Sequence, residues 1–151
     1  MRVSAKADYA VRATVEIAAG GGGPLKRNAL ATAQHIPAGF HENILLDLRR
    51  ADVIRSQRGP EGGYWLARPA EEITVADVVR AVEGPLASVR GTRPGALTFE
   101  GTARPLEELW VAVRASLRSV LESVTLADLA AGELPEGIAR LTRDPDAWTA
   151  H

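Results

Sequence analysis

The clearest alternation of apolar and polar positions in the first half of the chain spans residues 38–51. Apolar side chains recur at helical spacing and predict one buried face, made of Phe40, Ile44, Leu45, Leu48 and Ala51. Polar side chains take the opposite face: His41, Glu42, Asn43, Asp47, Arg49 and Arg50. Ile36-Pro37 must separate this helix from an earlier one, because proline fixes its own φ and pushes the preceding residue out of the helical region. The pattern predicts two short helices joined by a tight turn.

A β-hairpin is predicted directly after the second helix. Two short runs rich in β-branched, aromatic and aliphatic residues, at 53–54 and 64–66, flank a tip with glycines at positions 59, 62 and 63. Arginines stand at 55, 58 and 68 on this ribbon, and guanidinium groups suit a phosphate backbone or a minor groove. Residues 28–68 thus have the order of a helix-turn-helix with a wing. In DNA-binding versions of that unit the second helix enters the major groove.

Further helices are predicted on both sides of this unit. Residues 4–19 form an amphipathic helix with Ser4 as its N-cap, and a glycine run ends it. Thr74 and Asp77 form a capping box that starts another short helix, which ends at Gly84-Pro85. Residues 85–102 have no regular period and are predicted to be a loop. The fold expected is mainly α with a small β-hairpin wing, and the winged helix-turn-helix unit covers residues 1–84.

The longest periodic stretch lies in residues 103–131. Apolar residues spaced alternately by four and three form a heptad-like seam of Leu106, Trp110, Val113, Leu117, Val120 and Val124. Small residues form a second stripe roughly 110° around the helix, made of Ala112, Ser116, Ser119 and Ser123. We predict that one face packs on the chain's own domain while the small face meets a second copy; a core helix in a monomer is the alternative. A short helix starts at Thr125 and ends near Gly132. In the C-terminal tail, residues 132–151, one more turn is expected at 134–138 and the end from Pro145-Asp146 is expected to be mobile.

The net charge of −1 hides an asymmetry between the two halves. Residues 1–68 hold ten Lys/Arg and six Asp/Glu, a charge of +4, whereas residues 69–151 hold eight and thirteen, a charge of −5. A basic N-terminal half fits a surface that faces phosphate, although a bias of this size also arises by chance. The chain has no 18-residue apolar run and no leader-like start, so a cytoplasmic location is expected.

Several short motifs occur together over roughly residues 1–130. They are Lys6-Ala7-Asp8-Tyr9-Ala10, Ile36-Pro37 with Phe40 and Ile44-Leu45, Ser56-Gln57-Arg58-Gly59 with Gly62-Gly63-Tyr64, Leu66-Ala67-Arg68, Ile73-Thr74-Val75-Ala76-Asp77-Val78-Val79, Ala81-Val82-Glu83-Gly84-Pro85-Leu86, Trp110 and Thr125-Leu126-Ala127-Asp128-Leu129. In this combination the chain resembles the IscR/NsrR/CymR-type winged-helix transcriptional regulators of bacteria, the Rrf-two family. The resemblance implies a homodimer that binds double-stranded DNA at a palindromic operator, and we predict a repressor.

The candidate DNA contacts follow from the helix-turn-helix geometry and the resemblance together. The set comprises Lys6 and Asn28, the second-helix residues Ala38, Gly39, Phe40, His41, Asn43 and Arg49, and the wing residues Arg55, Ser56, Arg58 and Gly59. Asparagine can read adenine through two hydrogen bonds, and histidine can donate to a base or a phosphate. His41 occupies a slot that is usually apolar in the family.

The chain departs from the family at the loop where its iron–sulfur members carry three cysteines. Gly91 stands about where the first would be, and the chain has no cysteine anywhere. Because thiolates bind such clusters, we do not expect this chain to share the cluster or the cysteine-based sensing of those family members, and we expect no cofactor and no metal site. Asp8, a cluster ligand in some members, is expected to cap its helix or form a local ion pair. The expected effector is a small molecule or a protein, with Trp65 and Trp110 as candidate pocket walls, although buried aromatic residues more often belong to a core.

An enzyme is not expected. The chain has three histidines, no thiol, and neither a G-x-S-x-G nor a G-x-x-x-x-G-K-[ST] motif. His35 and His41 bracket the proline turn, but no H-x-x-E-H or related metal-binding motif accompanies them. The competing hypothesis is a protein-interaction module with a winged-helix fold that no longer binds DNA.

Overall fold

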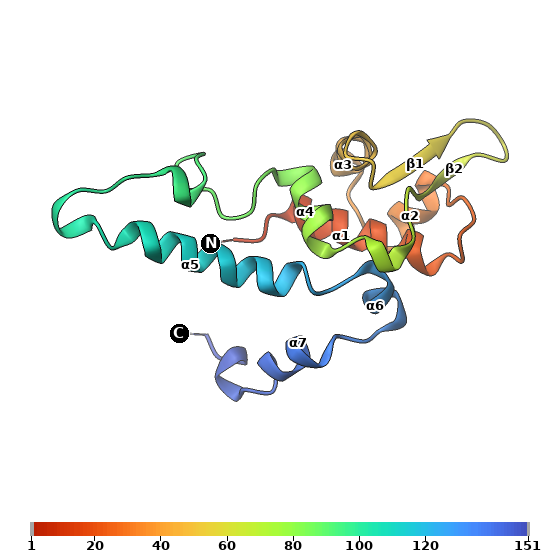
Figure 1. Ribbon diagram of the computed structural model, residues 1–151. Helices are drawn as coiled ribbons and strands as arrows, with labels where there is room; N and C mark the ends of the chain where they lie inside the picture. The colour runs from red at the N-terminus through yellow and green to blue at the C-terminus, as the bar shows by residue number, and fades with distance from the viewer. Residues whose placement is uncertain (1, 151) are drawn as a thin grey trace.

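The computed structural model describes residues 2–150, and the fold is mainly helical with one two-stranded antiparallel sheet, as predicted. Figure 1 shows the helices of the first half and the hairpin gathered at one end, with α5 extending away from them. The first half contains α1 (Ala5–Ala19), α2 (Arg27–Ala33), α3 (Ala38–Arg50), β1 (Ile54–Gln57), β2 (Gly63–Leu66), η1 (Ala70–Glu72) and α4 (Val75–Glu83). The second half contains η2 (Pro94–Ala96), η3 (Gly101–Ala103), α5 (Leu106–Leu121), α6 (Leu126–Ala131), α7 (Glu136–Leu141) and η4 (Pro145–Trp148).

Helix α1 is the centre of the core. The Ser4 hydroxyl accepts a hydrogen bond from the Ala7 backbone N–H at 3.0 Å, which confirms the predicted N-cap. The buried side of α1 is lined by small residues, so α4 and α6 can pack closely against it; these are Ala7, Ala10, Ala13 and Thr14, with Ile17 at the end. Asp8 forms the expected local ion pair, with Arg12 at 2.6 Å.

The wing is a short ribbon that is joined to the core on one side. Its register pairs Ile54 with Leu66 and Gln57 with Gly63. The backbones of Leu25 and Tyr64 exchange two hydrogen bonds of 2.9 and 2.8 Å, which add a rung beside β2. The hairpin is thereby held at a defined angle to the helices that precede it.

Two capping boxes set the starts of α4 and α6, both as predicted. Thr74 and Asp77 cap α4 reciprocally, and Thr125 and Asp128 do the same for α6. The Val75 N–H donates to the Val124 carbonyl at 2.9 Å, so the two helix starts lie side by side. Gly132 ends α6 at φ 75°, a left-handed conformation that favours glycine.

Helix α5 packs through only one side. All of its residues are described, and none is buried. The predicted seam residues within α5 are half-buried, and α5 contacts η2 and α4. Arg80 of α4 and Arg118 of α5 both bind the Glu122 carboxylate, and their hydrogen bonds lower its pKa to about 2. The small-residue stripe lies exposed on another side of the helix.

The loop between α4 and α5 is more ordered than its sequence indicated. Val89 and Thr92 exchange backbone hydrogen bonds of 2.9 and 3.0 Å, with Arg90 and Gly91 at positive φ between them. Pro94 is fully buried. This segment therefore packs against α5 as part of the fold.

Candidate nucleic-acid interface

Helices α2 and α3 form the helix-turn-helix. His35 adopts φ 51° in the turn between them, and the buried Ile36 anchors that turn in the core. Pro37 precedes the first turn of α3 in extended conformation, so a new helix begins at Ala38. We refer to α3 as the reading helix.

The buried face of the reading helix contains partly different residues from those that the sequence predicted. His41, expected on the exposed face, is only 4% exposed and packs beside Ile44, Leu45 and Leu48. Phe40, expected in the core, is 39% exposed, and Ala51 is exposed as well. The reason is tertiary, because the Phe40 ring packs edge-on against Tyr9 of α1, with ring centroids 5.3 Å apart. His41 is therefore turned inward and cannot reach a base edge in this structure.

Burial also changes the chemistry of His41. Within residues 2–150 its buried Nε2 atom has no hydrogen-bond partner. Burial lowers the pKa of His41 below its ordinary value of 6.5, and the nearby Arg27 lowers this pKa further while Glu42 opposes the effect. The neutral imidazole is the form that fits this position.

Acid should destabilise the protein through this side chain. Because the pKa of His41 is lower in the folded state than in the unfolded chain, the unfolded chain takes up the proton first, and the free energy of unfolding falls as the pH drops below about 6.5. We expect His41→Leu to flatten this part of a stability profile measured by urea denaturation between pH 5 and 8. The control is His35→Asn, since His35 is exposed and asparagine tolerates positive φ. An unchanged slope in His41→Leu would contradict the assignment.

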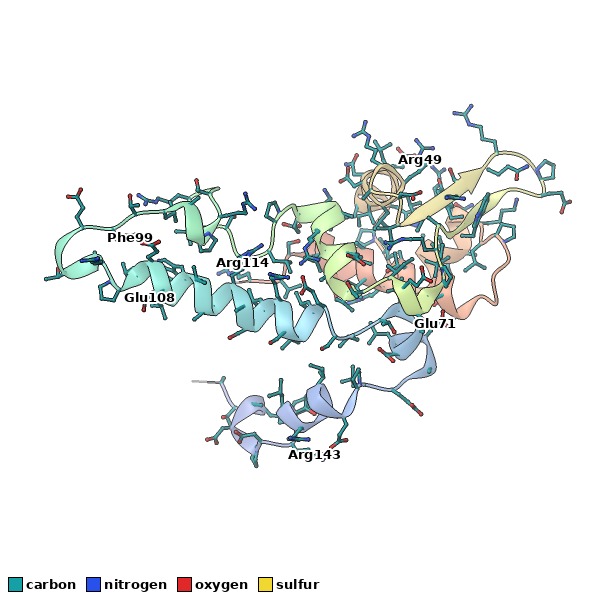
Figure 2. The ribbon with its side chains drawn as sticks, viewed as in Figure 1. Arg49, Glu71, Phe99, Glu108, Arg114 and Arg143 are labelled. Atoms are coloured by element: carbon teal, nitrogen blue, oxygen red, sulfur yellow. The ribbon has the colours of Figure 1, made fainter. Side chains whose placement is uncertain are left out.

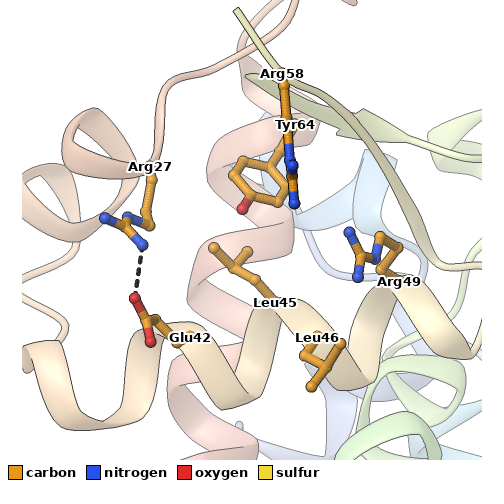
Figure 3. Close-up of a pocket in the computed structure, with 7 residues that line it drawn as sticks. All are labelled: Arg27, Glu42, Leu45, Leu46, Arg49, Arg58 and Tyr64. Carbon is orange, nitrogen blue, oxygen red and sulfur yellow. Dashed lines mark hydrogen bonds and ion pairs between the residues drawn. The ribbon is translucent and has the colours of Figure 1, made fainter. Parts of the chain in front are cut away.

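A hollow of about 400 Å³ lies between the reading helix and the wing. Figure 3 shows Arg49 of α3 and Arg58 of the wing beside it, with Tyr64 of β2 behind. Arg27 of α2 reaches across the opening and binds Glu42 of α3 at 2.8 Å. The Arg49 Nη1 atom lies 3.4 Å from the Ser56 hydroxyl, so its guanidinium group spans from the helix to β1. Cationic groups from three elements thus border one opening.

A second hollow, of about 320 Å³, flanks the other side of the reading helix. Gly39, Asn43 and Arg50 line it, and Leu46 borders both hollows. Lys6 also lines it, but its Nζ donates to the Asp47 carboxylate at 2.6 Å and to the Val82 carbonyl at 3.0 Å. The predicted phosphate ligand Lys6 is therefore engaged within the protein, where it holds the reading helix against α1 and α4.

The wing tip is braced by Lys26, which directly precedes α2. The Lys26 ammonium donates to the carbonyl oxygens of Gly59 and Pro60 across the tip. Arg58 is exposed and forms no ion pair within the described part of the chain. Arg55 is exposed as well and lies 3.7 Å from Asp52. The tip is held in place while the guanidinium of Arg58 stays available.

The structure brings most of the predicted contact residues to one side of the molecule. The residues that lie exposed are Asn28, Ala38, Gly39, Phe40, Asn43, Arg49, Arg55, Arg58 and Gly59, while Ser56 is half-buried. Trp65 and Trp110 are both half-buried, on β2 and on α5, and neither lines the two hollows described above. The effector pocket stays a prediction.

Sequence reasoning missed four residues of this surface: Lys26, Arg27, Leu46 and Tyr64. Arg27 forms an ion pair with Glu42, which lies 15 positions further along the chain. Lys26 donates a hydrogen bond to the wing tip, which lies more than 30 positions further along. No local pattern indicates such pairs. Leu46 could have been found, because it follows Asn43 and precedes Arg49 by three positions each and therefore lies on the same side of the helix as both.

The chain's donor set does not fit an iron–sulfur cluster. It contains no cysteine, so the thiolates that hold such clusters are missing. Residues 2–150 also bring together no group of three or more His, Asp or Glu side chains that could hold a metal ion. Among the same residues no helix is long and apolar enough to cross a membrane.

Residues 3–132 match the model of the Rrf2 family, described as an iron-dependent transcriptional regulator. An HTH-type transcriptional regulator of Mycobacterium tuberculosis is 54% identical over 145 residues, which cover 95% of this chain and 90% of that protein. CymR of Bacillus subtilis, also named as an HTH-type transcriptional regulator, is 33% identical over 131 residues, or 86% of this chain and 90% of CymR.

Solved structures of transcriptional regulators also resemble this chain. The structure of CymR, described as the global cysteine regulator of B. subtilis, has a TM-score of 0.73 at 32% identity, and the match covers 89% of this chain and 99% of the CymR chain. IscR of T. potens has a TM-score of 0.68 at 30% identity, and the match covers 100% of this chain and 93% of the IscR chain. The fold is that of the winged-helix transcriptional regulators, and the family and the relatives named here are regulators rather than enzymes. The chain belongs to the Rrf2 family, and within it this is a member without cysteine.

Proposed function

We propose that two copies of this chain bind a palindromic DNA operator and repress transcription from the cytoplasm, in response to a signal other than an iron–sulfur cluster. The observation that carries the proposal is the exposed side of the reading helix, where Asn43 and Arg49 lie exposed and Arg49 borders the same hollow as Arg58 of the wing. The family membership supports regulation of transcription. Occupying an operator would block access of the transcription machinery.

In this proposal the N-terminal end of the reading helix enters the major groove. Asn43 lies one turn beyond Gly39 on the exposed side, where its amide can read adenine through two hydrogen bonds. Ala38 and Gly39 have no bulky side chain, so the helix backbone can approach the groove closely. Arg55, Ser56, Arg58 and Gly59 lie on the adjoining strand and tip, where the wing would meet phosphates or the minor groove.

The dimer is proposed to form through residues 103–131, and residues 1–84 form the DNA-binding unit. The heptad seam of α5 packs toward its own domain, which leaves the stripe of Ala112, Ser116, Ser119 and Ser123 free for the partner. A two-fold pair of reading helices matches two half-sites about one DNA turn apart. A small molecule or a protein is the proposed effector.

The purified protein should bind duplex DNA from the region upstream of its own gene as a dimer. We expect an affinity that falls steeply with salt, because Lys and Arg side chains displace counterions from phosphates. Fluorescence anisotropy from 50 to 300 mM salt measures this dependence, and sedimentation measures the stoichiometry. The absence of any salt-sensitive binding would favour the interaction-module hypothesis instead.

A further inference from the structure

Leu46 is an apolar side chain in the middle of a polar row on the reading helix. Gly39, Asn43, Leu46 and Arg50 are spaced by four, three and four positions, so they follow one line along α3. Leu46 is half-buried, whereas the other three residues are exposed. It also lines both hollows that flank this line. The outer ridge of the reading helix therefore carries an aliphatic group between an amide and a guanidinium group.

The acidic side chains beside this ridge are paired within the protein. Glu42 binds Arg27 at 2.8 Å, and Asp47 binds Lys6 at 2.6 Å. Each pair offsets a negative charge that would otherwise repel the phosphate backbone of DNA. Figure 2 shows Arg49 at the edge of the molecule, on the reading helix beside the wing. The surroundings of the ridge are thus suited to a polyanion.

The major groove of DNA offers one kind of apolar group to such a ridge. Thymine carries a methyl group at C5, whereas the other groups on the base edges are hydrogen-bond donors and acceptors. An aliphatic side chain placed against those polar groups would leave them without water or a partner. Against a methyl group it gains buried apolar area instead. The chemistry therefore favours a thymine opposite Leu46.

We propose that Leu46 determines operator specificity by packing against the 5-methyl group of a thymine. The inference rests on the proposed DNA binding and names bases that the reading helix recognises. Asn43 precedes Leu46 by three residues, which is about 4.5 Å along the helix axis. Successive base pairs are about 3.4 Å apart. The Asn43 amide and the Leu46 side chain therefore reach adjacent base pairs, with an adenine at the first and a thymine at the second.

Replacing thymine by uracil removes only the methyl group and tests the inference directly. Selection from a random duplex library defines the bound sequence, and each thymine is then replaced by uracil at the equivalent positions of both half-sites. We expect one position at which uracil weakens binding of the unaltered protein roughly fourfold for each half-site, or about fifteenfold in a symmetric operator. Fluorescence anisotropy at constant salt measures the affinity.

The variant Leu46→Ala should lose the discrimination at this position. It should bind thymine and uracil DNA equally, with the affinity that the unaltered protein has for uracil DNA. Alanine favours a helix, so the fold should be retained, which circular dichroism checks. Leu141→Ala is the matched control and should still discriminate against uracil. Leu141 is 55% exposed on α7 and lies near Arg143, which Figure 2 shows at the opposite edge of the molecule from Arg49.

The adjacent contact is tested with 7-deazaadenine, which lacks the N7 acceptor of adenine. Next to the position that is sensitive to uracil, this base should weaken binding of the unaltered protein and leave binding of Asn43→Ala unchanged. Leu46→Ala should remain sensitive to 7-deazaadenine. The two contacts are thereby assigned to separate side chains.

The outcomes separate the thymine contact from DNA binding itself. If no duplex is selected and no salt-sensitive binding occurs, the proposed function fails and the thymine contact fails with it. If a defined sequence is bound and uracil is tolerated at every position, the inference alone is overturned. It is also overturned if Leu46→Ala keeps its sensitivity to uracil. Loss of that sensitivity in Phe40→Ala instead would assign the methyl contact to Phe40, which borders one of the same hollows.

Discussion

Replacing Gly62 with alanine is expected to lower the free energy of unfolding by roughly 3 kcal/mol and to disorder the wing. A Cβ atom at this position would lie 2.1 Å from the Gln57 carbonyl oxygen and 2.7 Å from its carbon. Both atoms belong to the backbone, so no side-chain rotation relieves the clash and the hairpin must open. Urea denaturation measures the loss, and DNA affinity should fall with it because Arg58 is displaced.

Gly39→Ala is the matched control for that experiment. A Cβ at Gly39 would meet no atom of the described residues within 4 Å, and Gly39 lies in the first turn of a helix. Alanine is the better helix former, so stability should stay constant or rise by up to about 1 kcal/mol. If Gly62→Ala unfolds at the same urea concentration as the unaltered protein, the tight hairpin described above is wrong.

Removing Arg49 and Arg58 together should weaken DNA binding roughly 100-fold while leaving the fold intact. Both side chains are exposed, and they border the same hollow between the reading helix and the wing. Arg58→Ala alone should weaken binding to all sequences and reduce the salt slope if it contacts phosphate. If the Arg58 side chain enters a groove, Arg58→Ala should instead weaken the preference for a particular base at one position of the operator.

The control for these variants is Arg104→Ala, which makes the same change of charge at an exposed site. Arg104 precedes α5, whose first turn lies at the end of the molecule far from the wing in Figure 1. Anisotropy at constant salt compares the variants. Equal affinities for Arg104→Ala and for the double variant Arg49→Ala/Arg58→Ala would remove this surface from the proposed mechanism.

The family resemblance and the local elements were predicted from the sequence because they depend on neighbouring residues. The capping boxes at Thr74 and Thr125 are examples, since each needs only a hydroxyl and a carboxylate three positions apart. The helix-turn-helix and wing motifs likewise identified the Rrf2 family before any geometry was known. The missing cysteines excluded a thiolate-bound cluster by composition alone.

The face of the reading helix could not be predicted in the same way. Periodicity placed Phe40 inside and His41 outside, but a helix has a broad apolar side whose edges depend on what packs against it. Tyr9 of α1 receives the Phe40 ring at the edge of the core, and His41 takes the inner position. The spacing of apolar residues does not predict which polar side chains are buried.

The sequence by itself determined the order and type of the elements, the winged-helix class and the absence of thiolate chemistry, because capping, turn and spacing rules act over a few residues. Tertiary structure alone decided which side chains the proposed DNA-binding surface presents. Lys6 is bound to Asp47, Arg27 to Glu42 and Lys26 to the wing tip, and each pair joins elements far apart in the chain. Only folding brings such charges within hydrogen-bond distance, and that decides which of them remain free to meet a ligand.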